Sequence, residues 1–284
     1  MKPAPFTYHA PTSLDEALGL LAATPDARVL AGGQSLVPRM RARIEKPAVV
    51  IDLNRVAGLD GLAVDGGAVT AGAMVRQQTL VEDDAVFAAH PLIRRAGSHA
   101  GFATTRHRGT IGGSIAFAAP WAELSATTIT LGATITVRSA SGERRIAAGD
   151  FFLGPHETAL QAGELVTEVH FPAAAAGTGF GFAETSPRYR DYATAAASAS
   201  ITVAGGTVAD ARLTLLRAAP APLQVDVASI LGGRAVDEAA IADVVGALAD
   251  LDPPSDIEAS GRHRARLART LTARALADAW EAAA

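Results

Sequence analysis

Two glycine pairs, Gly32-Gly33 and Gly112-Gly113, constrain the fold of this chain more than any other feature of its sequence. Each pair follows an apolar residue and precedes a small hydroxyl residue, Ser35 in the first segment and Ser114 in the second. Because glycine has no Cβ and tolerates positive φ, several main-chain N–H groups can converge there on an anion that a larger side chain would push away. A single pair most often marks a tight turn, but two pairs in matching contexts indicate a cradle for a dinucleotide diphosphate.

The residues around the first pair indicate a small α/β unit. Ser13 precedes an apolar run with helical spacing and predicts a capped helix, and 28–31 and 49–53 are interpreted as buried strands. Ser35 is expected to cap a short helix that runs through Met40. Such a helix would place N–H groups and the positive end of its dipole beside the glycine pair.

Beyond residue 58 the pattern changes to short strands separated by glycine and aspartate turns, with helices between them. The expected strands are a hairpin over 62–72 and the segments 133–138, 144–148, 164–171, 193–203 and 208–217. The expected helices are 79–99, 121–131, 225–231, 238–248 and 261–280. Because 173–179 has the composition of a linker, we expect a domain boundary there.

Composition disfavours several classes of function. The 25 basic and 29 acidic residues are dispersed and give a net charge of -4, so a nucleic-acid partner is not expected. The absence of cysteine excludes disulfides, thiolate nucleophiles and iron–sulfur clusters held by cysteines of this chain. The seven histidines show no metal-ligand spacing, so no metal site is expected either.

The motifs of other nucleotide-binding folds and of serine hydrolases are missing. There is no G-x-G-x-x-G after a strand and no G-x-x-x-x-G-K-S/T, and Val37 stands where a nucleophile elbow beginning at Gly33 would need its second glycine. No apolar run is long enough to span a membrane, and the N-terminal residues lack the apolar core of a signal peptide. We therefore expect a cytoplasmic protein without a membrane span.

The segments 31–36 and 108–114 resemble the two flavin signatures of the FAD-binding medium subunit of molybdenum hydroxylases, the family of carbon monoxide dehydrogenase and xanthine dehydrogenase. The similarity continues through 120–124, 151–152, 163–166, 191–193 and an arginine-rich C-terminal helix, and so covers nearly the full length. It implies an α+β fold, in which a two-lobed FAD-binding domain, a small α/β lobe plus a larger α+β lobe, precedes a C-terminal domain of a small antiparallel sheet with helices. We expect the first domain over 1–175, with lobes of about 1–57 and 58–175, and the second over 178–284.

The same resemblance implies a function in electron transfer. FAD, bound noncovalently, would take electrons from 2Fe–2S clusters in a small partner subunit and pass them to an external acceptor. A large partner subunit would carry the molybdenum cofactor, and the complex would be a dimer of heterotrimers. Two alternatives remain open at this point: a self-contained FAD oxidase of the wider superfamily, although few residues follow the linker to form a substrate-binding cap, and a scaffold that has lost its flavin.

The resemblance also implies which residues hold FAD. The residues expected around the diphosphate are Leu30, Ala31, Gly32, Gly33, Gln34, Ser35 and Leu36 on one side and Thr110, Gly112, Gly113 and Ser114 on the other. Glu123 stands where the family usually has aspartate and would help to anchor the nucleotide, Leu165 and Val166 would lie beside the flavin, and Tyr192 would lie near its ring. No catalytic residue is expected.

For some of these residues, the pattern alone favours a plainer interpretation. Leu165 and Val166 would be core strand residues, Tyr192 a buried aromatic residue, and Glu123 an acid favoured by the helix dipole. In addition, 182–186 contains no lysine, whereas many members of the family have one there that reaches the flavin ring.

Overall fold

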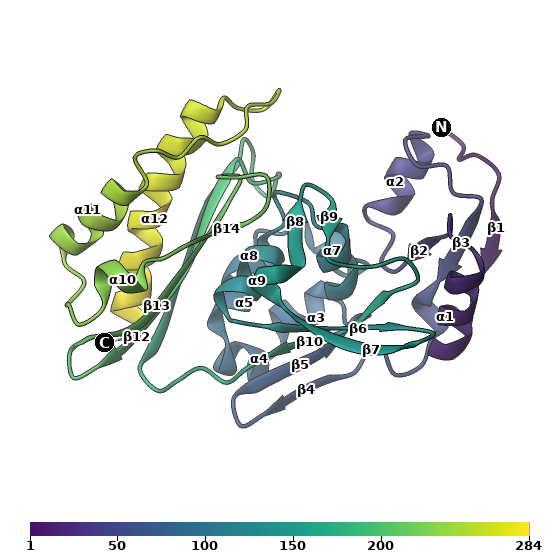
Figure 1. Ribbon diagram of the computed structural model, residues 1–284, viewed down its shortest axis with the longest axis horizontal. Helices are drawn as coiled ribbons and strands as arrows, with labels where there is room; N and C mark the ends of the chain where they lie inside the picture. The colour runs from purple at the N-terminus through teal and green to yellow at the C-terminus, as the bar shows by residue number, and fades with distance from the viewer. Residues whose placement is uncertain (284) are drawn as a thin grey trace.

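A small parallel sheet with short helices forms the N-terminal part of the chain, at the right of Figure 1. The computed structural model describes residues 1–283. The strands, in sheet order, are β1 (Thr7–His9), β3 (Val49–Asp52) and β2 (Arg28–Leu30). The helices are α1 (Leu14–Ala23), α2 (Leu36–Arg41) and the single turn η1 (Leu53–Arg55). The Ser13 side chain accepts a hydrogen bond from the Glu16 amide at 3.2 Å, so the predicted capped helix is confirmed.

An antiparallel sheet of five strands forms the middle of the molecule (Figure 1). Its strands, in sheet order, are β4 (Leu62–Asp65), β5 (Ala68–Gly72), β10 (Leu165–Phe171), β6 (Thr134–Ser139) and β7 (Gly142–Ala147). The associated elements are α3 (Gln77–Glu82), α4 (Asp84–Ala89), α5 (Pro91–Gly97), α6 (Ala103–Arg106), α7 (Ile111–Phe117), α8 (Glu123–Thr130), α9 (Ala148–Phe151), β8 (Phe152–Gly154) and β9 (Glu157–Thr158). Sheet and helices share one apolar core, which includes Val69, Ile115 and Phe171.

The C-terminal part is a four-stranded antiparallel sheet covered by helices, at the left of Figure 1. Its elements are β11 (Thr178–Thr185), β12 (Ala195–Ala204), β13 (Thr207–Leu216), β14 (Leu223–Val225), α10 (Ala228–Leu231), α11 (Glu238–Ala247) and α12 (Gly261–Ala283). The buried positions of α12 recur at helical spacing and include Ala268, Leu271, Ala275 and Ala279. A Cβ on Gly181 would stand only 1.9 Å from the carbonyl oxygen of Ala275, so the small residues let α12 pack directly on the sheet.

Helices α5 and α8 connect the middle sheet to the C-terminal sheet, because α5 contacts β11 and α8 contacts both β12 and β13. The contact of α8 is partly polar: the Thr130 hydroxyl donates to the Thr214 hydroxyl at 3.0 Å. Thr130 and Thr214 are each 1% exposed, so this contact lies inside the junction between α8 and the C-terminal sheet.

The predicted strand at 28–31 is present, but it is not buried. It is an edge strand of the small sheet, so Arg28 is exposed and Val29 and Leu30 are only half-buried. The segment interpreted as a linker, 173–179, also differs from expectation, since β11 begins inside it, at Thr178.

Three predicted helices have different bounds in the structure. The helix expected over 79–99 is divided into three, because the Asp83 side chain accepts from the Val86 amide and begins a new helix, and Pro91 begins another. The helix expected from 121 begins only at Glu123, after a turn. The helix expected over 225–231 is confined to α10, since the preceding residues pair with β13 as β14.

Candidate functional site

The first glycine segment follows β2, where the chain turns toward α2. Gly33 has a φ of +73°, in the left-handed region that favours glycine. Within residues 1–283, the amides of Gly32, Gly33, Gln34 and Ser35 donate to no carbonyl or side-chain oxygen. Since buried or half-buried amides are normally paired, this run of N–H groups is suited to receive an anionic ligand.

Ser35 does not cap α2 as predicted. It occupies the N-cap position, but its backbone is helical, with φ of -105° and ψ of -49°, and its side chain makes no cap hydrogen bond. A capping residue is normally extended, which is what directs its hydroxyl back to the helix amides. The prediction is therefore wrong, and the Ser35 hydroxyl is not used by the helix.

The second glycine pair lies in a helix and not in a turn. Thr110 is the N-cap of α7, and its hydroxyl accepts from the Gly113 amide at 3.1 Å. Gly112 is buried in the same first turn, and its amide donates to the Ala73 carbonyl at 2.9 Å. Neither glycine has a positive φ, so both are required by close packing and not by backbone conformation.

The two glycine segments lie against each other. A Cβ on Gly32 would stand 2.2 Å from the carbonyl oxygen of Arg108 and 2.7 Å from the Cα of Gly109. A Cβ on Gly113 would stand 3.4 Å from the Cβ of Ala31. The predicted meeting of the two segments at one site is thus observed, with the run of amides at 32–35 beside the N-terminal end of α7.

Polar residues that the sequence analysis did not identify join the two segments. The Asn54 side chain donates to the Ala31 carbonyl at 2.9 Å, and Arg76 donates both to Asn54 Oδ1 at 2.8 Å and to the Arg108 carbonyl at 2.6 Å. Asp52 accepts from the Asn54 amide at 2.8 Å. A signal was available for Asp52 and Asn54, because they end the predicted strand 49–53 next to the strand that carries the glycine pair.

Asp52 is held in its charged form. Partial burial opposes this, but hydrogen bonds from the Tyr8 hydroxyl and from Asn54 lower the pKa of its carboxyl below the usual range. Burial lowers the pKa of the Arg76 guanidinium, and the neighbouring Arg108 lowers it further. Arg76 and Arg108 thus place two guanidinium groups at this end of the site, among the carboxylates of Asp52 and Asp60.

Leu165 and Val166 begin β10 and are both buried. Leu165 packs into the core of the N-terminal part with Leu18, Ile51 and Met74, whereas Val166 packs into the core of the middle sheet. Their positions agree with the plainer interpretation as core strand residues, and they lie where the two cores meet.

Glu123 is buried, with 7% of its surface exposed, in the first turn of α8. Burial raises its pKa to about 8, and the nearby carboxylate of Glu184 contributes in the same direction, while Arg106 opposes it. The Glu184 side chain is 1% exposed, and neither of its oxygens accepts a hydrogen bond within residues 1–283. Glu184 lies in the segment 182–186, which contains no lysine, so a second acid accompanies Glu123.

Tyr192 is 56% exposed, so the interpretation as a buried aromatic residue is wrong. Its ring stacks on Trp121, with 4.6 Å between the ring centroids and 33° between the planes. The Trp121 ring also contacts the His156 ring edge-on, with 5.8 Å between the centroids. The His156 ring in turn contacts the Phe117 ring, with 4.4 Å between the centroids. Phe117 ends the helix that the second glycine pair begins, so these rings connect Tyr192 to the glycine segments through α7.

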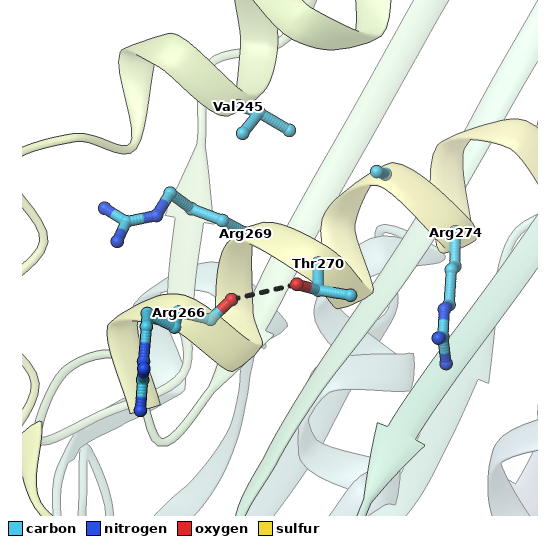
Figure 2. A pocket seen from close by; sticks show the side chains of 6 residues that line it. Val245, Arg266, Arg269, Thr270 and Arg274 are labelled. Atoms are coloured by element: carbon cyan, nitrogen blue, oxygen red, sulfur yellow. Dashed lines mark hydrogen bonds between the residues drawn. The ribbon is translucent and has the colours of Figure 1, made fainter. Parts of the chain in front are cut away.

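A separate pocket lies in the C-terminal part of the chain. It is a groove of about 620 Å³ between α11 and α12, lined by Val245, Arg266, Arg269, Thr270, Ala273 and Arg274 (Figure 2). In Figure 2 the side chains of Arg266 and Arg274 point downward from α12, whereas Arg269 extends to the left and donates to the carbonyls of Leu248 and Ala249 after α11. We assign it no ligand.

Within residues 1–283, no group of three or more histidine or acidic side chains is arranged to hold a metal ion. No helix in the same residues combines the length and the apolar character needed to cross a membrane.

Comparisons with known proteins assign both parts of the chain. Residues 4–174 match the FAD-binding domain of molybdopterin dehydrogenases, and 181–279 match the C-terminal domain of CO dehydrogenase flavoproteins. The chain is 35% identical over 283 residues to the carbon monoxide dehydrogenase medium chain of Hydrogenophaga pseudoflava, covering 99% of both chains. It is 35% identical over 282 residues to the nicotine 6-hydroxylase medium subunit of Paenarthrobacter nicotinovorans, covering 98% of this chain and 99% of that one.

The structure gives the same result. It superimposes with a TM-score of 0.96 on a chain of the carbon monoxide dehydrogenase from Hydrogenophaga pseudoflava that lacks the Mo-pyranopterin moiety of the molybdenum cofactor, at 35% identity and with 100% of both chains covered. The predicted fold class is thus confirmed.

Proposed function

Since this chain belongs to the family of FAD-binding medium subunits of molybdenum hydroxylases, we propose that it carries electrons at its FAD from the iron–sulfur clusters of a partner subunit to an external acceptor. The chain itself contains no cysteine to ligate such clusters. It is an oxidoreductase subunit whose substrate chemistry belongs to another chain.

The proposed FAD-binding site rests on one observation. The amides of Gly32 to Ser35 have no acceptor within residues 1–283, and they lie where the two glycine segments meet without room for a Cβ at Gly32. We assign the diphosphate of FAD to this place, held by residues 30–36 on one side and by Thr110, Gly112, Gly113 and Ser114 on the other. Arg76 and Arg108 supply positive charge beside it.

The remaining site residues are assigned by their positions relative to this cradle. Glu123 anchors the nucleotide from α8, Leu165 and Val166 form an apolar wall where two cores meet, and Tyr192 presents an exposed ring to the isoalloxazine system. FAD, when bound, supplies a carrier that accepts and releases both electrons of a hydroxylation. The protein's part is to bind the diphosphate, hold the ring and limit its contact with water.

The partners follow from the same reasoning. The relatives are named as medium chains or medium subunits, which supports an assembly with other subunits. We propose a small iron–sulfur subunit and a large molybdenum-cofactor subunit, arranged as a dimer of heterotrimers in the cytoplasm. We also propose that the boundary between the two domains lies at about 175–178, and that the first domain consists of lobes of about 1–57 and 58–175.

The substrate of the complex is not determined by this chain. Two relatives that are each 35% identical to it are named for different chemistry, carbon monoxide oxidation and nicotine hydroxylation. This supports the view that the flavoprotein subunit is a common electron-transfer module.

Purification of the tagged chain from its native source tests the proposal. We expect a small cysteine-rich chain and a large molybdenum-binding chain to accompany it, and native mass spectrometry to give two copies of each. The substrate of the complex should bleach the flavin absorbance only when these partners are present. If the isolated, metal-free chain oxidises an organic substrate at an appreciable rate, the self-contained oxidase is correct instead.

A further inference from the structure

The stacked pair of Trp121 and Tyr192 bridges two parts of the fold. Trp121 lies in the turn before α8, in the matched FAD-binding domain, and Tyr192 lies in the loop before β12, in the matched C-terminal domain. The two rings lie 4.6 Å apart between centroids, with 33° between their planes. Tyr192 is nevertheless 56% exposed, so its side chain has accessible surface for a further contact.

The backbone around the pair is strained. Five residues other than glycine have a positive φ within residues 1–283, and four of them adjoin the aromatic residues: Ala118, His156, Arg190 and Arg217, with φ of 46°, 61°, 59° and 62°. Such a conformation persists only where the surroundings fix it, most often at functional sites. The concentration of strain beside the rings is an observation independent of the flavin assignment.

A charged network of two buried arginines and two exposed acids contacts Trp121 and the loop of Tyr192. The Arg217 guanidinium lies over the Trp121 ring, 5.7 Å from its centroid, and donates to Asp256 at 2.6 Å and to Glu258 at 2.8 Å. Arg264, 1% exposed, donates to the other Asp256 oxygen at 2.7 Å and to the Thr194 carbonyl at 3.3 Å. Thr194 is two residues beyond Tyr192, so one network reaches the tryptophan and the tyrosine loop.

We propose that Trp121 is a positioning residue that holds Tyr192 against the isoalloxazine ring, and that Arg217 is a positioning residue for Trp121. The order of groups is then Arg217, Trp121, Tyr192 and the flavin ring. This inference rests on the proposed function, which places Tyr192 at that ring. An aromatic side chain that is half-exposed gains a fixed orientation from a large ring behind it, at little cost in conformational entropy.

Flavin fluorescence tests the inference, because a tyrosine stacked on the isoalloxazine ring quenches its emission. In the FAD-loaded full-length chain, Tyr192→Ala should raise the emission per bound flavin several-fold. Trp121→Ala should raise it as well, and Trp121→Phe, which keeps an aromatic ring behind Tyr192, should stay near the parent value. The double variant should be no brighter than Tyr192→Ala alone, since the tryptophan acts only through the tyrosine.

Two further variants complete the design. Tyr189→Ala removes a 77% exposed ring from the same loop that lies outside the stack, and should leave the emission unchanged. Arg217→Lys keeps a charge near Asp256 and Glu258 but has no planar group to place over Trp121, and should raise the emission less than Trp121→Ala. Thermal unfolding of each variant shows whether it is folded.

The outcomes separate the inference from the proposed function. If Trp121→Ala leaves the emission unchanged, or if its effect adds to that of Tyr192→Ala, Trp121 does not position the tyrosine. If Arg217→Lys leaves the flavin emission unchanged, Arg217 does not position Trp121. If Tyr192→Ala itself has no effect although flavin is bound, the placement of Tyr192 at the ring in the proposed function is the part that is wrong.

Discussion

Gly32 lies so close to the backbone of Arg108 that a Cβ on the glycine would stand 2.2 Å from the arginine carbonyl oxygen. Arg76 holds that same carbonyl with a hydrogen bond of 2.6 Å, so the oxygen cannot move away without breaking it. The two glycine segments are therefore fixed face to face by one position that tolerates no side chain.

Gly32→Ala should separate these segments and release FAD. Because Gly32 is buried against a backbone carbonyl, we expect the variant to lose some stability and to bind FAD at least about tenfold more weakly, equal to 1.4 kcal/mol of binding free energy. Titration of the FAD-free chain with FAD measures this. Gly19→Ala is a matched control: its Cβ would meet nothing within 4 Å, and it should leave FAD affinity intact and stabilise α1 slightly.

Gly112 and Gly113 should behave differently although they are neighbours. A Cβ on Gly112 would stand 2.4 Å from Ala73 Cβ and 2.8 Å from its carbonyl oxygen, so Gly112→Ala should reduce stability by more than about 1 kcal/mol even without FAD. Gly113→Val should instead give a folded chain with little flavin, because its nearest neighbours are the Thr110 hydroxyl and Ala31 Cβ of the cradle. Unfolding in urea and flavin content per chain measure the two effects. Normal flavin content in Gly113→Val would mean that this glycine is only a packing residue.

FAD should be released completely when the protein is denatured. The chain has no cysteine to form a thioether with the flavin, and none of the residues assigned to the diphosphate is a histidine. Acid precipitation should therefore leave a colourless pellet and a yellow supernatant. Yellow colour that remains with the denatured polypeptide would contradict the noncovalent assignment.

The meeting of the glycine segments could be predicted from sequence because each segment carries its own local signal, a glycine pair at the end of a predicted strand or before a predicted helix. The physical reason why each of these positions must be glycine could not be predicted from the sequence. Gly112 is helical and is required by the approach of Ala73, which follows a strand far away in the sequence. Such an approach depends on tertiary packing, and periodicity contains no information about it.

Burial was the least predictable property, for the same physical reason. Val29 and Leu30 are apolar but only half-buried, since β2 pairs on one side alone. Arg106, in a charged run that we would expect to face water, is buried and donates to Gln78 at 2.8 Å. Tyr192 is exposed because its contact is Trp121, which also belongs to a loop. Each of these results from the arrangement of elements and not from local pattern.

Glu123 should make the stability of the chain depend on pH. Its pKa of about 8 in the folded chain, against 4.5 when unfolded, means that the folded state keeps a proton that the unfolded state releases. Stability from this group is therefore present below about pH 4.5 and is lost as the pH rises toward 8, by at most about 1.4 kcal/mol per pH unit. In Glu123→Gln the side chain is neutral at every pH, so the free energy of unfolding should decrease less as the pH rises.

Urea unfolding at pH 5.5 and pH 8, with and without FAD, checks this. We expect the loss of unfolding free energy between the two values to be smaller in Glu123→Gln than in the parent, and the variant to be the more stable of the two at pH 8. Glu238→Gln is the matched control, because Glu238 is also in the first turn of a helix but is exposed, so the parent pH dependence should persist. Parallel profiles for Glu123→Gln and the parent would show that Glu123 is charged in the folded chain, with Arg106 compensating for its burial.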